Sequence, residues 1–374
     1  MSREIAKADL AVVGAGIVGL AHAYDARRRG LDVVVVDRDE RAVGASIRNF
    51  GHCFLSATAA GAALETATEA RRRWLELGRR AGFTVTEGGS LVVARHEDEL
   101  AVLESLSRDP ARGAHVVTTA EVAKLAPVST DRVLGGLHAA LDLRVDPREA
   151  IAAVAAHLRA EGVVFVWNAA VTEVTSDELR TSQGVVRAER VVVCPGPDLQ
   201  TLFPDVFAQR EGLTRVKLQM LTVRPPNGRV YRPALLTGLS LLRYPGFTAL
   251  PEVDAVRRRL EREAPDLVAH GIHLIITQRA NGELIIGDTH EYATTVSPFG
   301  DERLDALVLG EAAQILDVSA LEVLSRWHGV YPTAPGDPFL VAAPADGVRV
   351  VSVVSGIGMT TALGLAPRVL DDLL

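Results

Sequence analysis

The sequence predicts an α/β protein with two sheets, one buried and parallel, the other mostly antiparallel. Short apolar runs at 8–13 and 32–37, separated by a helical segment, are typical of strands buried on both faces of a parallel sheet. Segments between about 213 and 330 alternate apolar and polar residues, which indicates an antiparallel sheet with one packed and one open face. An apolar run at 348–354 then returns the chain to the first sheet.

The helices are predicted by residue spacing and by start and stop signals. The helix over 17–29 ends at an arginine run followed by Gly30. A later helix has Pro147 in its first turn and stops at Gly162. Further helices are expected at 61–81, 97–106, 252–263 and 301–315, and a closing helix is expected after residue 356.

The remaining strands are expected at 88–95, 189–196, 216–223, 272–279 and 282–289. Because the chain leaves the first sheet and comes back to it, each domain is expected to be discontinuous. The nucleotide-binding domain is assigned residues 1–80, 145–212 and 330–374, and the substrate-binding domain residues 81–144 and 213–329.

Length and composition exclude several classes of protein. A chain of 374 residues suggests two closely packed domains, since one domain usually holds roughly 100–200 residues. Apolar residues make up 48% and charged residues 23% of the chain, so it can form a large core and is neither disordered nor fibrous. The net charge of −7 and the dispersed basic residues argue against a nucleic-acid partner.

The cysteines and the N-terminal segment indicate a cytoplasmic protein. Cys53 and Cys194 cannot form a disulfide framework and lack the spacing of a zinc site, so no metal is expected. Residues 21–23 imitate the cleavage site of a secretory signal, but cleavage there would destroy the strand–helix–strand unit of residues 8–37. No apolar run approaches the ~18 residues that a membrane-spanning helix needs.

A glycine motif at the start of the chain predicts dinucleotide binding. Gly14, Gly16 and Gly19 follow the first strand and open the first helix, where glycines permit a tight turn and bring backbone amides close to a pyrophosphate. Asp37 ends the second strand, where its carboxylate can accept hydrogen bonds from a ribose. The alternative is a glycine-rich turn that binds no ligand.

A second glycine-bearing helix start favours a flavin over a nicotinamide. The segment 355–361, SGIGMTT, runs from a buried strand into the closing helix. Such a helix N-terminus can stabilise the anionic reduced flavin, whereas NAD does not require it. The alternative is a helix start that merely packs on the sheet.

At these residues the chain resembles the D-amino-acid oxidase (DAO) superfamily, which includes glycine oxidase and sarcosine oxidase. The segments that carry the resemblance, in the family's order, are VVGAGIVGLAHAYDARRRGLDVVVVDRD, GASIRNFG, GGSLVVAR, LDLRVDPREA, ERVVVCPG, GELIIGDT, RWHGVYPTAPGDPFLV and SGIGMTTALGLAPRVLDDLL. The resemblance implies a Rossmann-like FAD-binding domain and a second, substrate-binding domain built on a mostly antiparallel sheet.

The resemblance also implies which residues hold FAD. Residues 45–46 would touch its pyrophosphate, residues 48–51 would pass beside the flavin ring, and Val171 would hold the adenine through its backbone. The full set of expected cofactor-binding residues is Gly14, Ala15, Gly16, Ile17, Val18, Gly19, Asp37, Arg38, Ala45, Ser46, Arg48, Asn49, Phe50, Gly51, Val171, Cys194, Gly196, Gly356, Ile357, Gly358, Met359 and Thr360.

Departures from the family pattern shape the functional expectations. Arg48 stands where relatives with covalent flavin carry a histidine, and no cysteine stands near 327–333, so noncovalent FAD is expected. Tyr331 stands where the family usually has an arginine, and Ile285 where a lysine linked to oxygen activation stands in relatives. An oxidase that uses O2 is favoured, and a dehydrogenase passing electrons to a partner remains an alternative.

Two short segments, RNFGH and VKLQM, resemble the branch of the family associated with aminophosphonate breakdown. The resemblance implies oxidation of 2-aminoethylphosphonate or its N-methyl derivative to phosphonoacetaldehyde, with ammonia or methylamine and hydrogen peroxide. The alternative substrates are glycine-like or sarcosine-like amino acids. The oligomeric state is left open.

A phosphonate dianion needs cations, so basic residues in segments expected to face the cavity between the domains are candidates for binding it. His328, Tyr331 and His290 are the expected catalytic residues. The expected substrate-binding residues are Arg48, His52, Lys217, Gln219, Arg243 and Tyr292. An alternative for Lys217 is an edge-strand lysine that reaches solvent, and an alternative for His290 is an ordinary loop histidine.

Overall fold

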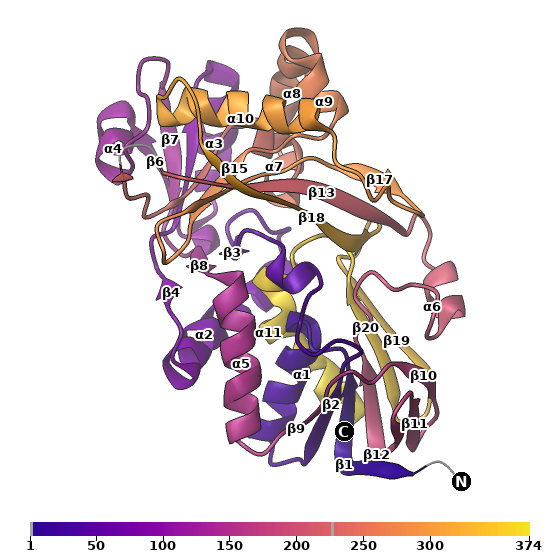
Figure 1. The fold of residues 1–374 in the computed structure, drawn as a ribbon. Helices are drawn as coiled ribbons and strands as arrows, with labels where there is room; N and C mark the ends of the chain where they lie inside the picture. The colour runs from indigo at the N-terminus through magenta and orange to yellow at the C-terminus, as the bar shows by residue number, and fades with distance from the viewer. Residues whose placement is uncertain (1–2, 226–227) are drawn as a thin grey trace.

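The structure is a computed structural model that describes residues 3–225 and 228–374. A parallel sheet forms the centre of the lower lobe in Figure 1. Its parallel strands, in spatial order, are β9 (Val164–Val166), β2 (Val33–Val36), β1 (Glu4–Val13), β12 (Gly184–Val193) and β20 (Val348–Val353). The hairpin strands β10 (Val171–Val174), β11 (Glu178–Thr181) and β19 (Phe339–Ala345) complete the sheet. The buried runs predicted at 8–13, 32–37 and 348–354 are therefore confirmed as strands of one sheet.

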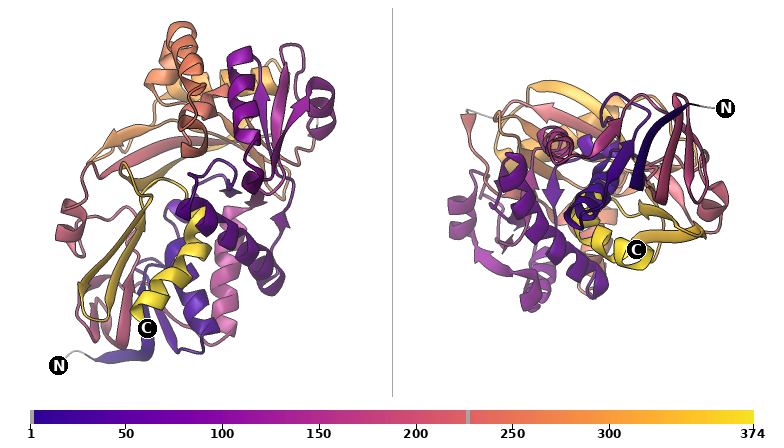
Figure 2. Two further views of the ribbon diagram at one scale, coloured as in Figure 1. Left: turned by 180° about the vertical axis from the view of Figure 1, so that it is seen from behind. Right: turned by 90° about the horizontal axis from the view of Figure 1, so that it is seen from below.

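Alternating side chains of this sheet enter two separate cores. Leu10, Val12 and Val33 face a core shared with helices α1 (Ile17–Arg28), α2 (Ala62–Ala81), α5 (Pro147–Ala160) and α11 (Gly358–Leu373). Ala11 and Val34 face the opposite core, which includes side chains of the β10–β11 hairpin and of α6 (Pro204–Ala208). Strand side chains point alternately to the two faces, so burial on both faces explains the unbroken apolar runs. Figure 2 shows α11, in yellow, beside the other helices of its layer.

The upper lobe is built on a nine-stranded sheet. Its strands, in order, are β17 (Glu291–Ala293), β13 (Thr214–Val223), β16 (Leu284–Gly287), β15 (Ile275–Gln278), β14 (Ala234–Leu236), β5 (Ser90–Ala94), β7 (Gly135–Ala139) and β6 (Ala114–Thr118), and β18 (Val323–Thr333) pairs with β13. Within this sheet, only the β14–β5 pair is parallel among the described strands. The prediction of a mostly antiparallel second sheet is confirmed.

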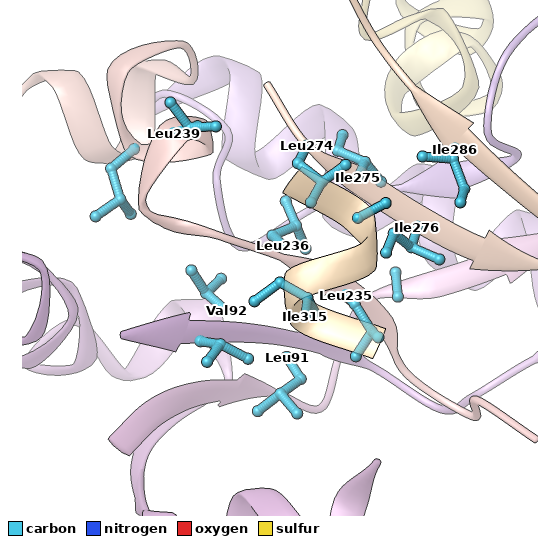
Figure 3. Packing of buried hydrophobic residues seen from close by; sticks show 14 of the residues in the cluster. Leu91, Val92, Leu235, Leu236, Leu239, Leu274, Ile275, Ile276, Ile286 and Ile315 are labelled. Carbon is cyan, nitrogen blue, oxygen red and sulfur yellow. The ribbon is translucent and has the colours of Figure 1, made fainter. Parts of the chain in front are cut away.

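Helices cover one face of the second sheet, as Figure 1 shows above β13. They are α3 (Glu97–Ser107), α4 (Thr119–Leu125), α7 (Pro245–Thr248), α8 (Val253–Glu263), α9 (Pro265–Ala269) and α10 (Glu302–Leu316). Figure 3 shows the resulting core, in which Ile315 of α10 lies among strand residues such as Leu235 and Ile276. No helix among the described residues is long and apolar enough to cross a membrane.

The second sheet is not open on its other face, contrary to the expectation from alternation. Strands β13, β15 and β16 are buried along almost their whole length. The physical reason is that Phe50 and Phe54, from the N-terminal part of the chain, pack into the same core as these strands. The face expected to meet solvent therefore lies against the rest of the molecule.

Two connections between the lobes position the cavity described below. A small sheet of β3 (His52–Cys53), β8 (Leu143–Val145) and β4 (Val85–Thr86) forms one of them. The other is β18, which pairs with β13 over its length and ends at Thr333, where it bridges to Ser355. The domain boundary expected between residues 329 and 330 falls inside β18.

Candidate functional site

The turn between β1 and α1 requires glycine for steric reasons. Gly14 has φ +98°, and a Cβ there would lie 2.4 Å from the carbonyl oxygen of Cys194. A Cβ on Gly19 would lie 1.9 Å from the carbonyl oxygen of Gly14. These contacts bring the turn close to β12 and the helix close to β1, which is the geometry that glycines provide in a dinucleotide-binding turn.

Asp37 lies at the end of β2, beside this turn. Its carboxylate accepts hydrogen bonds from the backbone N–H of Ala15 at 2.6 Å and of Asp39 at 3.0 Å. These bonds fix the carboxylate at the wall of a cavity that Arg38 and Val171 also line. Such a position suits an acceptor for ribose hydroxyls.

Two cavities meet at the N-terminus of α1. One lies beside Asp37, the other lies between the lobes, and both are lined by Gly16, Ser46 and Gly196. At the junction, the Ser46 hydroxyl accepts a hydrogen bond from the backbone N–H of Ile17 at 2.8 Å. The two cavities therefore adjoin at a helix N-terminus, where a pyrophosphate is favoured.

The space between the lobes is closed by the start of α11. Residues 355–360 line it, and the Ser355 hydroxyl is buried without a hydrogen-bond partner among the described residues. A Cβ on Gly356 would lie 2.7 Å from the hydroxyl oxygen of Tyr331, so glycine lets the helix start approach β18. An elongated cradle with an unpaired polar group at one end fits a dinucleotide with a second ring system.

The structure brings most of the expected cofactor residues to these cavities. All of them except Ala15 and Gly51 line one cavity or both. Ala15 donates its backbone N–H to Asp37, as described above. Close packing requires a glycine at position 51, because a Cβ on Gly51 would lie 1.8 Å from the carbonyl oxygen of Val145.

Arg243 is a cation at the wall of the cavity between the lobes. Its Nη2 donates to the carbonyl oxygen of Ser355 at 3.2 Å and to the hydroxyl oxygen of Tyr331 at 3.4 Å. Its Nε donates to Nε2 of His290 at 3.4 Å. No carboxylate of residues 3–225 or 228–374 forms an ion pair with this guanidinium.

His290 is a neutral imidazole whose tautomer follows from its partners. Its Nδ1 lies 2.9 Å from the carbonyl oxygen of Gly271, which can only accept, so Nδ1 carries the proton. Nε2 is then an acceptor for Arg243. Burial, together with the nearby His273 and Arg243, holds the pKa of His290 well below its usual range.

Asp288 completes the polar wall. It lines the same cavity, and its side chain is buried with Oδ1 lacking a hydrogen-bond partner among the described residues. Burial raises the pKa of this carboxyl group to about 8. Sequence reasoning missed Asp288 and the cavity-lining Tyr244; the available signal was a carboxylate placed directly after the apolar strand β16.

Among the expected substrate residues, Arg48, His52, Arg243, His290 and Tyr331 line the cavity. His52 is held by a hydrogen bond between its Nε2 and the Ser90 hydroxyl at 2.6 Å. Burial, with a further contribution from the cationic Arg144, lowers the pKa of His52 to about 3. The imidazole is therefore neutral near pH 7.

The other four, Lys217, Gln219, Tyr292 and His328, are not among the cavity-lining residues of the described chain. Lys217 is 3% exposed and its Nζ lies 2.5 Å from a carboxylate oxygen of Glu291, so it does not reach solvent as an edge lysine would. The amide of Gln219 donates to the carbonyl oxygen of Asp301, and Tyr292 is 55% exposed.

The chain is similar to one protein family and to several solved structures. The model of the DAO family, described as FAD dependent oxidoreductase, matches residues 9–371. No curated protein matches the chain. Glycine oxidase from Geobacillus kaustophilus is similar in structure, with a TM-score of 0.78 and 20% identity over 99% of this chain and 95% of that chain.

Two further solved structures have the same fold. L-proline dehydrogenase from P. horikoshii gives a TM-score of 0.80 and 17% identity over 98% of this chain and 93% of that chain. Iminodiacetate oxidase from Chelativorans sp. BNC1 gives a TM-score of 0.74 and 18% identity over 96% of this chain and 94% of that chain.

Proposed function

Because the chain belongs to the DAO family of FAD-dependent oxidoreductases, we propose that it oxidises the C–N bond of a small amine that carries an acid group. The observation that carries this proposal is Arg243, a guanidinium that faces the cavity without a carboxylate partner among the described residues. A cation at a cavity wall selects an anionic ligand.

The residues at the two cavities fit FAD. The β1–α1 turn and Ser46 would hold its pyrophosphate, and Asp37 its ribose. The start of α11 and residues 48–50 would hold the flavin end. When bound, FAD supplies the oxidant that accepts two electrons from the substrate. We expect the cofactor to be noncovalent, so that it is released when the protein is denatured.

The acid group of the substrate would be anchored by Arg243 and Tyr331. The Tyr331 hydroxyl and the Arg243 guanidinium lie 3.4 Å apart, so Arg243 brings a guanidinium to the place where Tyr331 replaces the family's usual arginine. His290 holds the guanidinium from its Nε side. Nη1 of Arg243 has no hydrogen-bond partner among the described residues, so its N–H groups can donate to a carboxylate or a phosphonate.

The relatives support an amine as the electron donor, since two of the similar structures are a glycine oxidase and an iminodiacetate oxidase. The finer proposal is 2-aminoethylphosphonate or its N-methyl derivative, which rests on the resemblance of RNFGH and VKLQM. Support from VKLQM is limited, because Lys217 and Gln219 are engaged in contacts elsewhere. Glycine and sarcosine are therefore the matched alternatives.

An anaerobic titration of the yellow protein tests the proposal. We expect the oxidised-flavin absorbance to bleach with 2-aminoethylphosphonate and its N-methyl derivative more readily than with glycine or sarcosine. The opposite order would assign the chain to amino acids. A colourless protein, or no bleaching with any amine, would overturn the function. Oxygen consumption during turnover then separates an oxidase from a dehydrogenase.

The variant Arg243→Met tests the anchor. We expect it to raise KM for the acid-bearing amine by about 10- to 100-fold, because a hydrogen-bonded charge contact is lost, and Arg243→Lys to have a smaller effect. Ethylamine, which has no acid group, is the control substrate, and its kinetics should be unaffected. Arg48→Met, in the same cavity, is the matched variant: a larger effect there would make Arg48 the anchor.

A further inference from the structure

Among the residues that the structure describes, Asp288 has no side-chain partner that explains its burial. Its backbone is held by His273, since each N–H donates to the other residue's carbonyl oxygen at 3.1 Å. Its side chain is 5% exposed and lines the cavity, and its Oδ1 has no hydrogen-bond partner among the described residues. Burying a carboxyl group without a partner costs free energy, so its place at the cavity wall requires another explanation.

Among the described residues, the groups around Asp288 form no hydrogen bond or close ion pair with its carboxyl group. Nδ1 of His290 lies 4.0 Å from Oδ1 of Asp288, but it donates its proton to the carbonyl oxygen of Gly271. The phenols of Tyr244 and Tyr331 also lie near this carboxyl group. Arg243 is the cation that acts on it, and it does so without forming an ion pair.

Resting on the function proposed above, we propose that Asp288 binds the substrate's ammonium group and accepts its proton. The cavity would then have an anion-binding end at Arg243 and a cation-binding end at Asp288, which together fit a small zwitterion. In the proton transfer, one N–H bond of the ammonium breaks and one O–H bond forms on the carboxylate. No electrons are transferred in this step, and it leaves the neutral amine that oxidation requires.

A consequence is that binding a cation displaces the proton of Asp288. Burial raises the pKa of the carboxyl group to about 8, so it is largely protonated near pH 7. An ammonium group placed against it favours the ionised form. Ligand binding near pH 7 should therefore release a proton from the protein, and affinity for a cation should rise as pH passes through about 8.

Two ligands that differ only in one charge test this proposal without turnover. Betaine (N,N,N-trimethylglycine) carries a permanent cation and has no amine lone pair, and 3,3-dimethylbutanoate is its neutral carbon isostere. Both would be titrated into the FAD-bound protein, with the flavin spectrum as the readout. We expect the preference for betaine to rise by about tenfold from about pH 6 to 9, because neither ligand titrates in that range.

The variant Asp288→Asn should show a weak preference that does not change with pH, and Asp288→Glu should restore part of the dependence. Calorimetry in buffers of different ionisation enthalpy should detect proton release on betaine binding by the natural protein and none by Asp288→Asn. If Asp288→Asn does not fold, the natural protein alone decides: a flat preference without proton release would overturn the role of Asp288.

The result also separates this proposal from the proposed function. If amines bleach the flavin but the betaine preference is flat, Asp288 is not the cation site while the function stands. If the preference rises with pH but no amine bleaches the flavin, the cation site stands and the function fails. If no amine bleaches the flavin and the betaine preference is flat, both proposals fail.

Discussion

Several histidines of this chain are kept neutral by burial. His22 lies inside α1, where its Nδ1 donates to the carbonyl oxygen of Val18 at 2.7 Å and its Nε2 has no partner among the described residues. Burial lowers the pKa of His22 to about 4. His273 is buried beside the cavity, and burial also lowers its pKa to about 4. Such groups make the free energy of unfolding depend on pH.

For His22 the dependence has a definite sign. Below about pH 6.5 the unfolded chain protonates this imidazole while the folded protein does not until about pH 4. The unfolded state then binds more protons, so stability falls as pH falls through this window. Between pH 7 and 5, we expect His22→Leu to lose about 2 kcal/mol less stability than the natural protein. Urea unfolding at both pH values measures this, with exposed His115→Leu as the control.

At the two cavities, the expected cofactor residues that come together most predictably are those placed by local backbone shape. Gly14 and Asp37 belong to one strand–turn–helix–strand unit, so their spacing alone places them together. Arg243 and Asp288 come from distant segments, and only the packing of the upper lobe brings both to one cavity. Lys217 was expected to bind the substrate, and its ion pair with Glu291 was not evident from sequence.

Among the elements, α11 and α2 approach each other through a glycine. A Cβ on Gly364 would lie 2.0 Å from the carbonyl oxygen of Thr66 and 3.0 Å from the backbone nitrogen of Ala70. Both atoms belong to the backbone of α2, so neither can move without shifting the helix. The close contact fixes where α11 begins, and its first turn lines the cavity.

We therefore expect Gly364→Ala to destabilise the protein by about 1–3 kcal/mol, the usual range for overpacking. Gly310 in α10 is the matched control, because a Cβ there meets nothing within 4 Å. Gly310→Ala should instead stabilise by about 0.5–1 kcal/mol through helix propensity. Chemical denaturation of both variants measures the difference, and equal effects would contradict the assigned helix contact.

Elements were predictable where a strand or helix carries its own pattern, as for β2 and α5. The strand β18 was not predicted, because its Arg326, Trp327 and His328 show no clear alternation. Its strand conformation comes from pairing with β13, in which His328 lies opposite Gln219. A tertiary contact therefore decides this element, and β-propensity depends on such contacts.

For the whole molecule, the cavity between the lobes is lined by residues of both, so FAD bound there should link cofactor binding to stability. A ligand that binds only the folded state stabilises it by about 4 kcal/mol at 1,000 times its Kd. We expect removal of FAD to lower Tm, and readdition to restore it. ADP should restore only part, because it reaches the cavity beside Asp37 but not the one between the lobes. Equal rescue by ADP would contradict a cofactor spanning both.

The order of the strands in the first sheet has a consequence for biosynthesis. β20 pairs with β12, and α11 packs against α1 and α2, yet residues 348–373 leave the ribosome more than 300 residues after β1. At roughly 5–20 residues per second, the nascent chain spends many seconds without the strand and helix that finish this domain. During that time β12 lacks its partner β20, and the wall that the start of α11 gives to the cavity between the lobes is missing.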